Sequence, residues 1–332
     1  MKGKHDFVVS NRFIKYEFTI RRNITLIQGD SATGKTALLS MLNAYSIDSE
    51  SSGIQVISDV PFFVYHFAGA TEWKTILQAN EGRIVFIDED FDFISTTEFA
   101  EYVGHSNSYY VIVTREDLEN LPYSVEEIYR IKESGKYGTT SQTYNVFESI
   151  YLDDKQKLSV RDESHGISCV ITEDSKAGFQ FWKTLCDKSQ KKCVSAFGKS
   201  NVIKCMREYE QENLLLIVDG AAFGSQMRRM NRALNGFSEN QCVLFLPESF
   251  EWILLKADLL QNIPKLQDIL TNTYDYVDSK EFMSWERFFT SLVVRESEGK
   301  PYQYNKNHLN EYFVGSKSIN KIETEFPIIS KI

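Results

Sequence analysis

The sequence predicts an α/β protein made of two successive sheet-containing units. Short apolar segments typical of buried parallel strands recur in both halves of the chain, and segments with helical periodicity separate them. A polar, weakly periodic stretch divides the two series, and such alternation is typical of parallel sheets covered by helices. We therefore expect a first α/β domain at residues 1–150, a linker at 151–166, a smaller α/β domain at 167–256 and a mainly helical C-terminal extension at 257–332.

The composition describes a folded protein and excludes several classes. The 332 residues suffice for two domains, and no apolar run reaches the roughly 20 residues that a membrane-spanning helix needs. The charged N-terminal residues lack the apolar segment of a secretory signal, so we expect a cytoplasmic protein that contacts no membrane. Five cysteines without a C-x-x-C pair support neither a disulfide framework nor a zinc knuckle. The net charge of −9 argues against a protein that simply coats nucleic acid, although the second half is nearly neutral.

The first motif with a chemical meaning is the pattern G-x-x-x-x-G-K-T at residues 29–36, which follows an apolar strand and precedes a helical pattern. Such a loop aims backbone N–H groups at the oxygens of a nucleoside triphosphate, and its glycines permit the sharp turn. Lys35 is expected to reach the β- and γ-phosphates, and Thr36 to give its hydroxyl to Mg²⁺. The sequence therefore predicts an ATP-binding loop made of Gly29, Asp30, Ser31, Ala32, Thr33, Gly34, Lys35 and Thr36.

Two further strands of the first domain end in polar residues. An apolar run at residues 84–87 is followed by Asp88 and Glu89, and a second run from Tyr109 ends at Thr114 and Arg115. Parallel sheets place their ligands at the carboxyl ends of their strands. These side chains are therefore expected at the same sheet edge as the phosphate-binding loop; the plain alternative is that they are solvated turn residues.

This series of strand, loop, helix and acidic strand end resembles the P-loop ATPases that have an added catalytic strand and a glutamate after the Walker B aspartate. The resemblance implies that Asp88 is the Walker B residue, which holds Mg²⁺ through water, and that Glu89 polarises the attacking water. An added strand between the P-loop and Walker B strands would carry a sensor of the γ-phosphate. Thr114 is the candidate for that role, with Arg115 as the second choice.

The chain departs from one branch of these ATPases. No L-S-G-G-type signature occurs, and the interval between Thr36 and Arg83 is too short for the helical domain with which ABC-type heads enclose ATP between two copies. Hydrolysis driven by dimer formation is therefore not implied. A P-loop kinase would share Lys35 and Thr36 and is a further alternative, which Glu89 disfavours because a kinase has no use for a base that activates water.

A new series of strands begins at residue 167, and two of them end in a carboxylate. Glu173 follows the strand at 167–172, and Asp219 follows the entirely apolar strand at 214–218. Divalent metals prefer clustered oxygen ligands and can then activate water against a phosphodiester. The two carboxylates are therefore candidate Mg²⁺ ligands, with turn or helix-cap roles as the alternative.

Residues 166–256 resemble a TOPRIM domain, the metal-dependent fold of topoisomerases, primases and OLD-type nucleases. In that fold a glutamate after the first strand and a D-x-D-like element after a later strand bind Mg²⁺. The resemblance implies these roles for Glu173 and Asp219, with Glu248 or Glu251 as a further acid. Ala221 stands where the second aspartate of the pair is expected, so one ligand of a two-metal nuclease is missing.

The combined architecture resembles the ATPase-plus-TOPRIM proteins of bacterial anti-phage defence. The resemblance implies that ATP binding or hydrolysis gates a nuclease activity on DNA or RNA in the C-terminal half. Three arginines on one expected helix could contact a phosphate backbone or form a solvated face: Arg228, Arg229 and Arg232. Ala221 leaves a second hypothesis open, in which the protein is a non-nucleolytic switch that recruits a protein partner or a second copy of itself. The C-terminal extension shows no motif with a chemical role.

Overall fold

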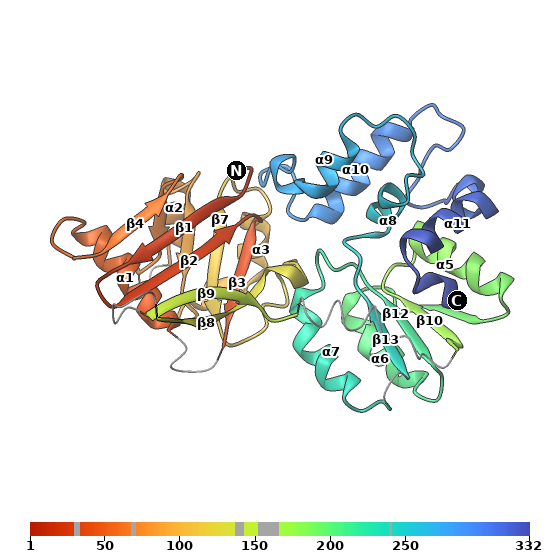
Figure 1. Ribbon diagram of the computed structural model, residues 1–332, viewed down its shortest axis with the longest axis horizontal. Coiled ribbons are helices and arrows are strands. Elements are labelled where there is room, and N and C mark those ends of the chain that lie inside the picture. Colours follow the sequence, from red (N-terminus) through yellow and green to blue (C-terminus); the bar gives the residue numbers. More distant parts are fainter. Residues whose placement is uncertain (30–33, 68–70, 137–142, 152–165, 239–240) are drawn as a thin grey trace. The chain divides into compact units, whose positions relative to one another are not determined.

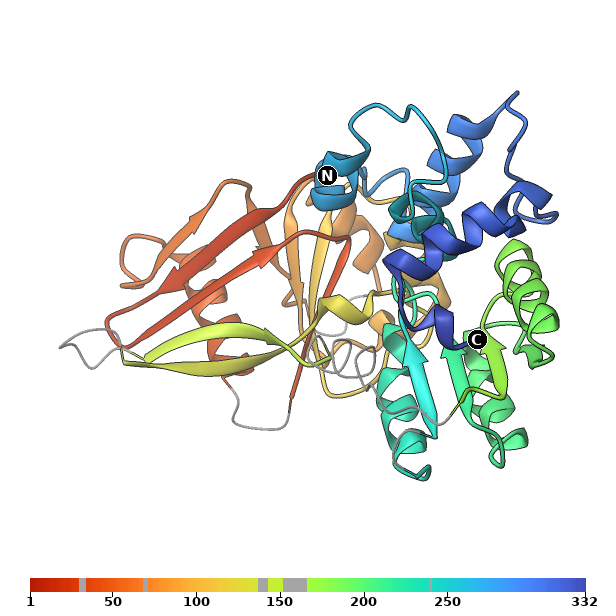
Figure 2. The ribbon, with the colours of Figure 1, turned by 45° about the vertical axis from the view of Figure 1, so that its right-hand side comes forward.

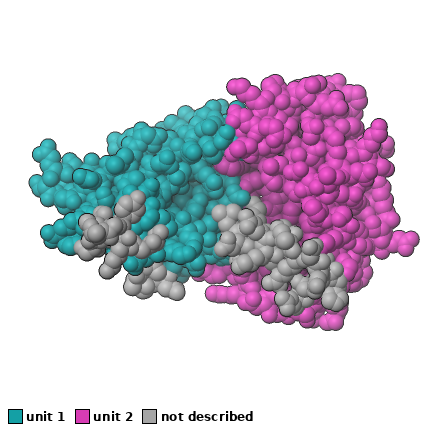
Figure 3. Space-filling view, viewed as in Figure 1, with its two compact units in different colours: residues 1–151, 272–284 teal, residues 152–271, 285–332 magenta. Residues whose placement is uncertain are grey.

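The computed structural model describes the whole chain apart from residues 30–33, 68–70, 137–142, 152–165 and 239–240 (Figure 1). The chain forms two compact units (Figure 3). The first unit consists of Met1–Tyr151 and Asn272–Ser284, and the second of Leu152–Thr271 and Trp285–Ile332. Almost all of the expected linker at 151–166 lies outside the described residues. Each unit has a sheet of its own.

A nine-stranded mixed sheet forms the centre of the first unit, in the order β4-β1-β2-β9-β8-β3-β7-β6-β5. Its strands are β1 (His5–Ser10), β2 (Ile14–Ile20), β3 (Ile24–Gln28), β4 (Gln55–Ser58), β5 (Phe62–Val64), β6 (Ile84–Ile87), β7 (Tyr109–Thr114), β8 (Ile128–Lys136) and β9 (Thr143–Ser149). The strands from β8 to β5 pair in parallel. By contrast, β1 pairs antiparallel with β2 and β4, and β8 forms an antiparallel ribbon with β9 (Figure 2).

The burial patterns explain this division of the sheet. Strands β3, β6 and β7 are buried along their whole length, as expected for parallel strands covered on both faces. Strand β2 instead alternates between buried and exposed residues over much of its length, which is typical of an antiparallel strand with one solvent-facing side. Strands β1 and β2 form a hairpin, and its antiparallel pairing makes the sheet mixed rather than purely parallel.

Strand β7 lies between β3 and β6 in the sheet. Leu26 of β3 is paired with Ile112 of β7, and Val111 of β7 with Phe86 of β6. Because all three strands run in the same direction, their carboxyl ends lie at one edge. The polar residues that follow these strands are therefore brought to the same place in the fold.

The helices of the first unit cover the sheet through apolar faces. They are α1 (Lys35–Ile47), α2 (Trp73–Ala79) and α3 (Thr97–Val103), with the short 3-10 helices η1 (Asp92–Ser95), η2 (Val125–Glu127) and η5 (Thr273–Asp275). Helix α1 buries Leu38 and Leu42 in a core that contains Phe7, Phe18 and Phe86. Burial of each of these side chains contributes about 1.5–3 kcal/mol to the free energy of folding. The position of α1, and of the loop that precedes it, is therefore set by the core.

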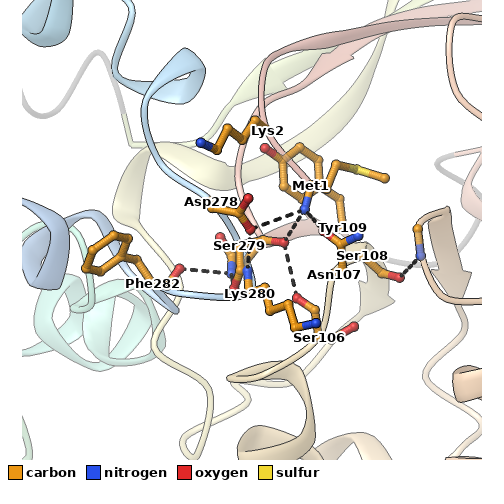
Figure 4. A network of polar contacts seen from close by, with 12 residues as sticks. Met1, Lys2, Ser106, Asn107, Ser108, Tyr109, Asp278, Ser279, Lys280 and Phe282 are labelled. Carbon is orange, nitrogen blue, oxygen red and sulfur yellow. Dashed lines mark hydrogen bonds and ion pairs between the residues drawn. The ribbon is translucent and has the colours of Figure 1, made fainter.

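The segment at 272–284 belongs to the first unit, although the sequence suggests a single extension from residue 257 onward. The amino group of Met1 donates a hydrogen bond to Ser279 Oγ (2.9 Å) and lies 3.6 Å from Asp278 Oδ1 (Figure 4). The buried Asn23 side chain donates to the backbone oxygen of Ser279 (3.1 Å). Polar contacts that sequence patterns do not reveal thus attach this segment to strands of the first sheet.

The second unit contains a four-stranded, wholly parallel sheet in the order β11-β10-β12-β13. Its strands are β10 (Cys169–Thr172), β11 (Lys192–Ser195), β12 (Leu214–Ile217) and β13 (Cys242–Phe245), and β10 and β12 confirm the strands expected at 167–172 and 214–218. Thr172 at the end of β10 is paired with Ile217 at the end of β12. The residues that follow these two central strands are therefore neighbours.

Helices surround this sheet, and the later ones come from the C-terminal part of the chain. They are α5 (Ala177–Lys188), α6 (Val202–Glu208), α7 (Met227–Leu234), α8 (Phe250–Lys256), α9 (Leu266–Thr271), α10 (Trp285–Ser297) and α11 (Ser316–Glu325), with η3 (Lys199–Asn201), η4 (Gly224–Gln226), η6 (Glu311–Val314) and η7 (Ile329–Lys331). In the part of the chain that the structure describes, none of the helices has both the length and the apolar character needed to cross a membrane.

Candidate functional site

Gly34, directly before α1, has a backbone conformation that demands glycine. Its φ of 88° lies in the left-handed region, and a Cβ atom there would come within 3.1 Å of the Tyr16 hydroxyl oxygen. That hydroxyl donates a hydrogen bond to the Gly34 backbone oxygen (2.9 Å). The backbone conformation therefore explains why the second glycine of the phosphate-loop motif is a glycine. Asp30, Ser31, Ala32 and Thr33 lie outside the described residues.

Lys35 and Asp88 lie near each other at the carboxyl edge of the first sheet. Lys35 is buried at the first position of α1, and its ammonium group donates to the backbone oxygen of Gly29. Asp88 follows β6, and its Oδ1 accepts a hydrogen bond from the Glu89 N–H (2.8 Å). Partial burial raises the pKa of Asp88, and the positive charge of Lys35 partly offsets that rise. The exposed Thr36 begins the same helix turn as Lys35.

Glu89 is held at the end of β7. One carboxylate oxygen accepts the Arg115 backbone N–H (2.7 Å), and the other is 2.9 Å from Arg115 Nε. Thr114 is buried, and its hydroxyl accepts the Glu116 N–H (3.0 Å) and donates to the Glu116 backbone oxygen (3.1 Å). The candidate sensor Thr114 therefore closes the turn after β7, while Arg115 orients Glu89.

The oxygen donors at this edge fit a Mg²⁺ ion of the kind found with nucleotides. Mg²⁺ usually takes one or two carboxylates, retains several water molecules and binds the phosphates of its substrate. Asp88, directly after β6, supplies a carboxylate, and Thr36, directly after Lys35, supplies a hydroxyl. These residues would hold the ion only together with a bound nucleotide.

A second candidate site is a cavity of about 300 Å³ in the second unit. Its walls come from the turns after β10, β11 and β12, from the start of α8, from α10 and from the segment around Tyr304. The lining residues are Glu173, Asp174, Ser175, Lys176, Gly178, Phe197, Gly198, Asp219, Phe250, Glu251, Glu286, Tyr304 and Lys306. Five of these are acidic, so the cavity is strongly negative.

The two carboxylates predicted from the strand ends meet in this cavity. The Asp219 N–H donates to Glu173 Oε2 (3.2 Å), which ties the turn after β12 to the turn after β10. A Cβ atom at Gly220 would lie 3.0 Å from the Pro247 backbone oxygen, so any larger residue directly after Asp219 would crowd this turn. Among the described residues, no hydrogen bond or salt bridge engages the Asp219 carboxylate.

The C-terminal segment supplies a cation and two further acids to the cavity. Glu251 is only 2% exposed and accepts a hydrogen bond from the Tyr304 hydroxyl (2.8 Å). Lys306 Nζ lies 2.9 Å from Glu286 Oε1 and 3.9 Å from Glu251 Oε1. Its backbone oxygen accepts the N–H of Ala177 at the start of α5 (2.9 Å), which fixes Lys306 beside the sheet edge.

These contacts leave the acidic groups incompletely neutralised. Burial raises the pKa of Glu173 to about 7. Burial and the surrounding carboxylates, first Glu286 and then Glu173, raise the pKa of Asp219 well above its usual range. Although burial opposes it, Glu251 and Glu286 raise the pKa of Lys306, so this side chain stays protonated. The raised carboxyl pKa values reflect the burial and the crowding of acidic groups in this cavity.

The stability of the protein in EDTA is expected to fall as the pH rises from about 5 to about 8. A carboxyl group whose pKa is higher in the folded than in the unfolded state binds more protons when folded, so its stabilising effect is lost as the pH rises through the folded value. For Glu173 that interval runs from its ordinary value of 4.5 to about 7. Thermal unfolding at several pH values measures this effect, and Mg²⁺ should restore the melting temperature at pH 8. A melting temperature in EDTA that does not fall over this pH range would contradict the raised pKa values.

The residues present fit a Mg²⁺ ion that keeps much of its water. In the described part of the chain, no three carboxylate, histidine or cysteine side chains lie close enough to enclose a metal ion. Glu173 and Asp219 nevertheless provide adjacent carboxylates that face an open cavity. Mg²⁺ often binds through one or two carboxylates and completes its shell with water and substrate phosphate, so the chemistry of this pair is compatible with that ion.

The predicted and observed members of this site differ in part. Glu173 and Asp219 come together as expected, because β10 and β12 are neighbours. Glu248 is buried, its backbone oxygen accepts the Ala221 N–H, and it does not line the cavity, whereas Glu251 does. Sequence reasoning missed Glu286, Tyr304 and Lys306, for which no local motif exists.

The arginines of α7 do not line the cavity. Arg229 and Arg232 are exposed, and Arg228 is half-buried. Their contact with a nucleic acid stays a prediction.

Comparisons of the chain with protein-family models, with curated proteins and with solved structures each found no match. Function is therefore inferred from the geometry of the two sites.

Proposed function

We propose that the first unit binds and hydrolyses ATP with Mg²⁺. The observation that carries this proposal is the strand order β3-β7-β6, which brings Lys35, Asp88 and Glu89 to one sheet edge. The added strand between the phosphate-loop strand and the acidic strand is the arrangement expected of ATPases that activate water with a glutamate. A chance match to the loop pattern would not account for these three side chains at the same edge.

Each of these residues has a role that its position supports. Lys35 would exchange its contact with the Gly29 backbone oxygen for the β- and γ-phosphates. Thr36 and Asp88 would hold Mg²⁺, which neutralises charge that develops on the phosphate oxygens. Glu89, oriented by Arg115, would accept a proton from the attacking water.

Binding of a fluorescent ATP analogue tests the first of these roles. Lys35→Ala is expected to weaken binding in the presence of Mg²⁺ by at least about tenfold, because a charge-assisted contact to phosphate is lost. Lys74→Ala, which removes an exposed lysine paired with Glu98, is the control and should bind as the wild type does. Equal affinity of Lys35→Ala and the wild type would contradict the proposal. Hydrolysis without any added acceptor would count against a kinase.

We further propose that the second unit hydrolyses phosphodiester bonds of nucleic acid with Mg²⁺, under control of the nucleotide state of the first unit. The observation in favour is the Asp219 carboxylate, which faces the cavity beside Glu173 without a hydrogen bond or salt bridge to any described residue. Lys306, held by Glu251 and Glu286, would contribute a fixed positive charge toward a substrate phosphate. The alternative is a switch that recruits a protein and cleaves nothing.

Cleavage of plasmid and single-stranded DNA separates these two proposals. Wild-type protein is incubated with Mg²⁺ or Mn²⁺, with and without ATP, and the products are separated by electrophoresis. Metal-dependent cleavage that changes with ATP is the expected result. Absence of cleavage under every condition would contradict the nuclease proposal and leave the switch.

A further inference from the structure

Phe197 is exposed at the rim of the acidic cavity in the second unit. It follows β11 and lines the cavity together with Glu173 and Asp219. With 77% of its surface accessible, it is the most exposed aromatic residue in the described part of the chain. A single exposed apolar residue is ordinary, but this one stands at the entrance to a candidate catalytic site.

The backbone of Phe197 is also in an unfavourable conformation. Its φ is 56°, in the left-handed region that bulky residues avoid. The Phe197 N–H donates to Ser195 Oγ (3.0 Å), and that hydroxyl donates to the Asp174 backbone oxygen (2.8 Å). The next N–H, of Gly198, donates to the Glu173 backbone oxygen (2.9 Å). The turn that presents the ring is thus held rigidly to the turn that carries Glu173.

One exposed lysine lines the same cavity as this ring, and a second lies close to the ring in sequence. Lys176 is exposed and lines the cavity. Lys199 lies two residues after Phe197, and its ammonium group reaches the turn after β12, where it donates to Ser225 Oγ (3.2 Å) and to the Ala222 backbone oxygen (3.3 Å). The cavity thus combines an aromatic side chain, lysines and carboxylates. The aromatic ring suits a nucleobase, the lysines suit phosphate groups, and the carboxylates suit a metal ion that assists the reaction.

We propose that Phe197 stacks on a nucleobase of a single-stranded nucleic acid and so places the adjacent phosphodiester over Glu173 and Asp219. This inference rests on the proposed function of the second unit and adds the substrate class. Aromatic side chains bind unpaired bases through their π-faces with little sequence preference. Bases within a duplex are already stacked on their neighbours, so the exposed ring selects single strands. The rigid turn fixes the distance between the stacked base and the carboxylates.

Fluorescence anisotropy with the full-length protein tests the proposal directly. Labelled oligothymidylate, oligouridylate and a DNA duplex of equal length are titrated at low salt with EDTA, which prevents metal-dependent cleavage. Phe197→Leu should bind the single strands about tenfold more weakly, the effect expected for one lost stacking contact, and Phe197→Trp should retain the wild-type affinity. Phe13→Leu, which alters a 51% exposed phenylalanine of the first unit, is the matched control. The two oligonucleotides distinguish DNA from RNA.

The melting temperatures of these variants separate a binding role from a structural one. Phe197→Gly removes both the ring and the conformational strain, so it should melt no lower than Phe197→Ala and still lose affinity. If Phe197→Leu binds single strands as tightly as the wild type, or if the wild type binds none, the proposal is overturned. Loss of self-association in Phe197→Leu at unchanged oligonucleotide affinity would also overturn it and assign the ring to a protein contact.

Cleavage assays distinguish this inference from the function on which it rests. Affinity that depends on Phe197 without cleavage under any metal and nucleotide condition would retain the base contact and refute the nuclease. Cleavage that Phe197→Leu leaves unchanged, with unchanged affinity, would refute the base contact and retain the nuclease.

Discussion

Glu89→Gln is expected to lower the rate of ATP hydrolysis by about 10²–10⁴-fold, the contribution typical of a general base. ATP affinity should stay close to that of the wild type, because Glu89 holds neither phosphate nor metal in the proposed arrangement. The glutamine keeps the shape of the side chain and can still accept the Arg115 backbone N–H, so the edge of the sheet is preserved. Phosphate release under saturating ATP, together with binding of a fluorescent analogue, separates the two effects.

A matched control for this variant lies one residue further along the chain. Asp90 is exposed, and Asp90→Asn removes the same charge without touching Arg115. It should hydrolyse ATP at nearly the wild-type rate. A similar loss of activity in both variants would show that hydrolysis depends on the total negative charge at this sheet edge rather than on Glu89. Full activity of Glu89→Gln would show that Glu89 is not the general base.

Asp219→Asn is expected to abolish Mg²⁺-dependent cleavage while it stabilises the protein in EDTA. The Asp219 carboxylate faces Glu173, Glu251 and Glu286, and their repulsion is relieved when its charge is removed. A rise in melting temperature of about 2–4 °C at pH 8 corresponds to about 1 kcal/mol for a unit of this size. Activity should fall at least about 10²-fold, because the metal loses one of its two protein carboxylates.

The opposite signs of the two effects separate loss of function from loss of fold. Mg²⁺ should raise the melting temperature of the wild type and have little effect on Asp219→Asn. Asp187→Asn, on the exposed face of α5, is the control and should retain cleavage and metal-dependent stabilisation. A variant at Asp219 that melts lower than the wild type in EDTA and still cleaves would show that this carboxylate is a structural group.

Local patterns predicted most of the secondary structure. The apolar runs at 84–87 and 214–217 were sufficient to identify β6 and β12, because only a strand buried on both faces tolerates such a sequence. Residues 14–20 alternate between apolar and polar side chains, and β2 shows the matching alternation of burial over much of its length. Such patterns involve only residues close together in the chain, so they can be recognised in a single sequence.

The choice between neighbouring acids could not be made from the sequence. Glu248 and Glu251 both follow β13, but Glu251 lies within α8, where it reaches the cavity and accepts a hydrogen bond from Tyr304. Glu248 lies before the helix and is buried elsewhere. The direction of the Glu251 side chain is set by α8 and that of Glu248 by the turn before it, and where that helix begins and how it packs depends on the rest of the fold.

The sequence by itself determined the buried strands β6, β7, β10 and β12, the phosphate-loop pattern and the carboxylates at the ends of β6, β10 and β12, because each depends on spacing within a short segment. Only the tertiary structure decided that β7 lies between β3 and β6, that residues 272–284 join the first unit, and that Lys306 enters the acidic cavity. The physical reason is that strand order and the pairing of buried charges are set by contacts between segments far apart in the chain. A buried carboxylate such as that of Glu251 is costly unless an opposite charge lies near it, because burial removes its water. Lys306 supplies that charge between Glu251 and Glu286, and no local sequence pattern reveals its position.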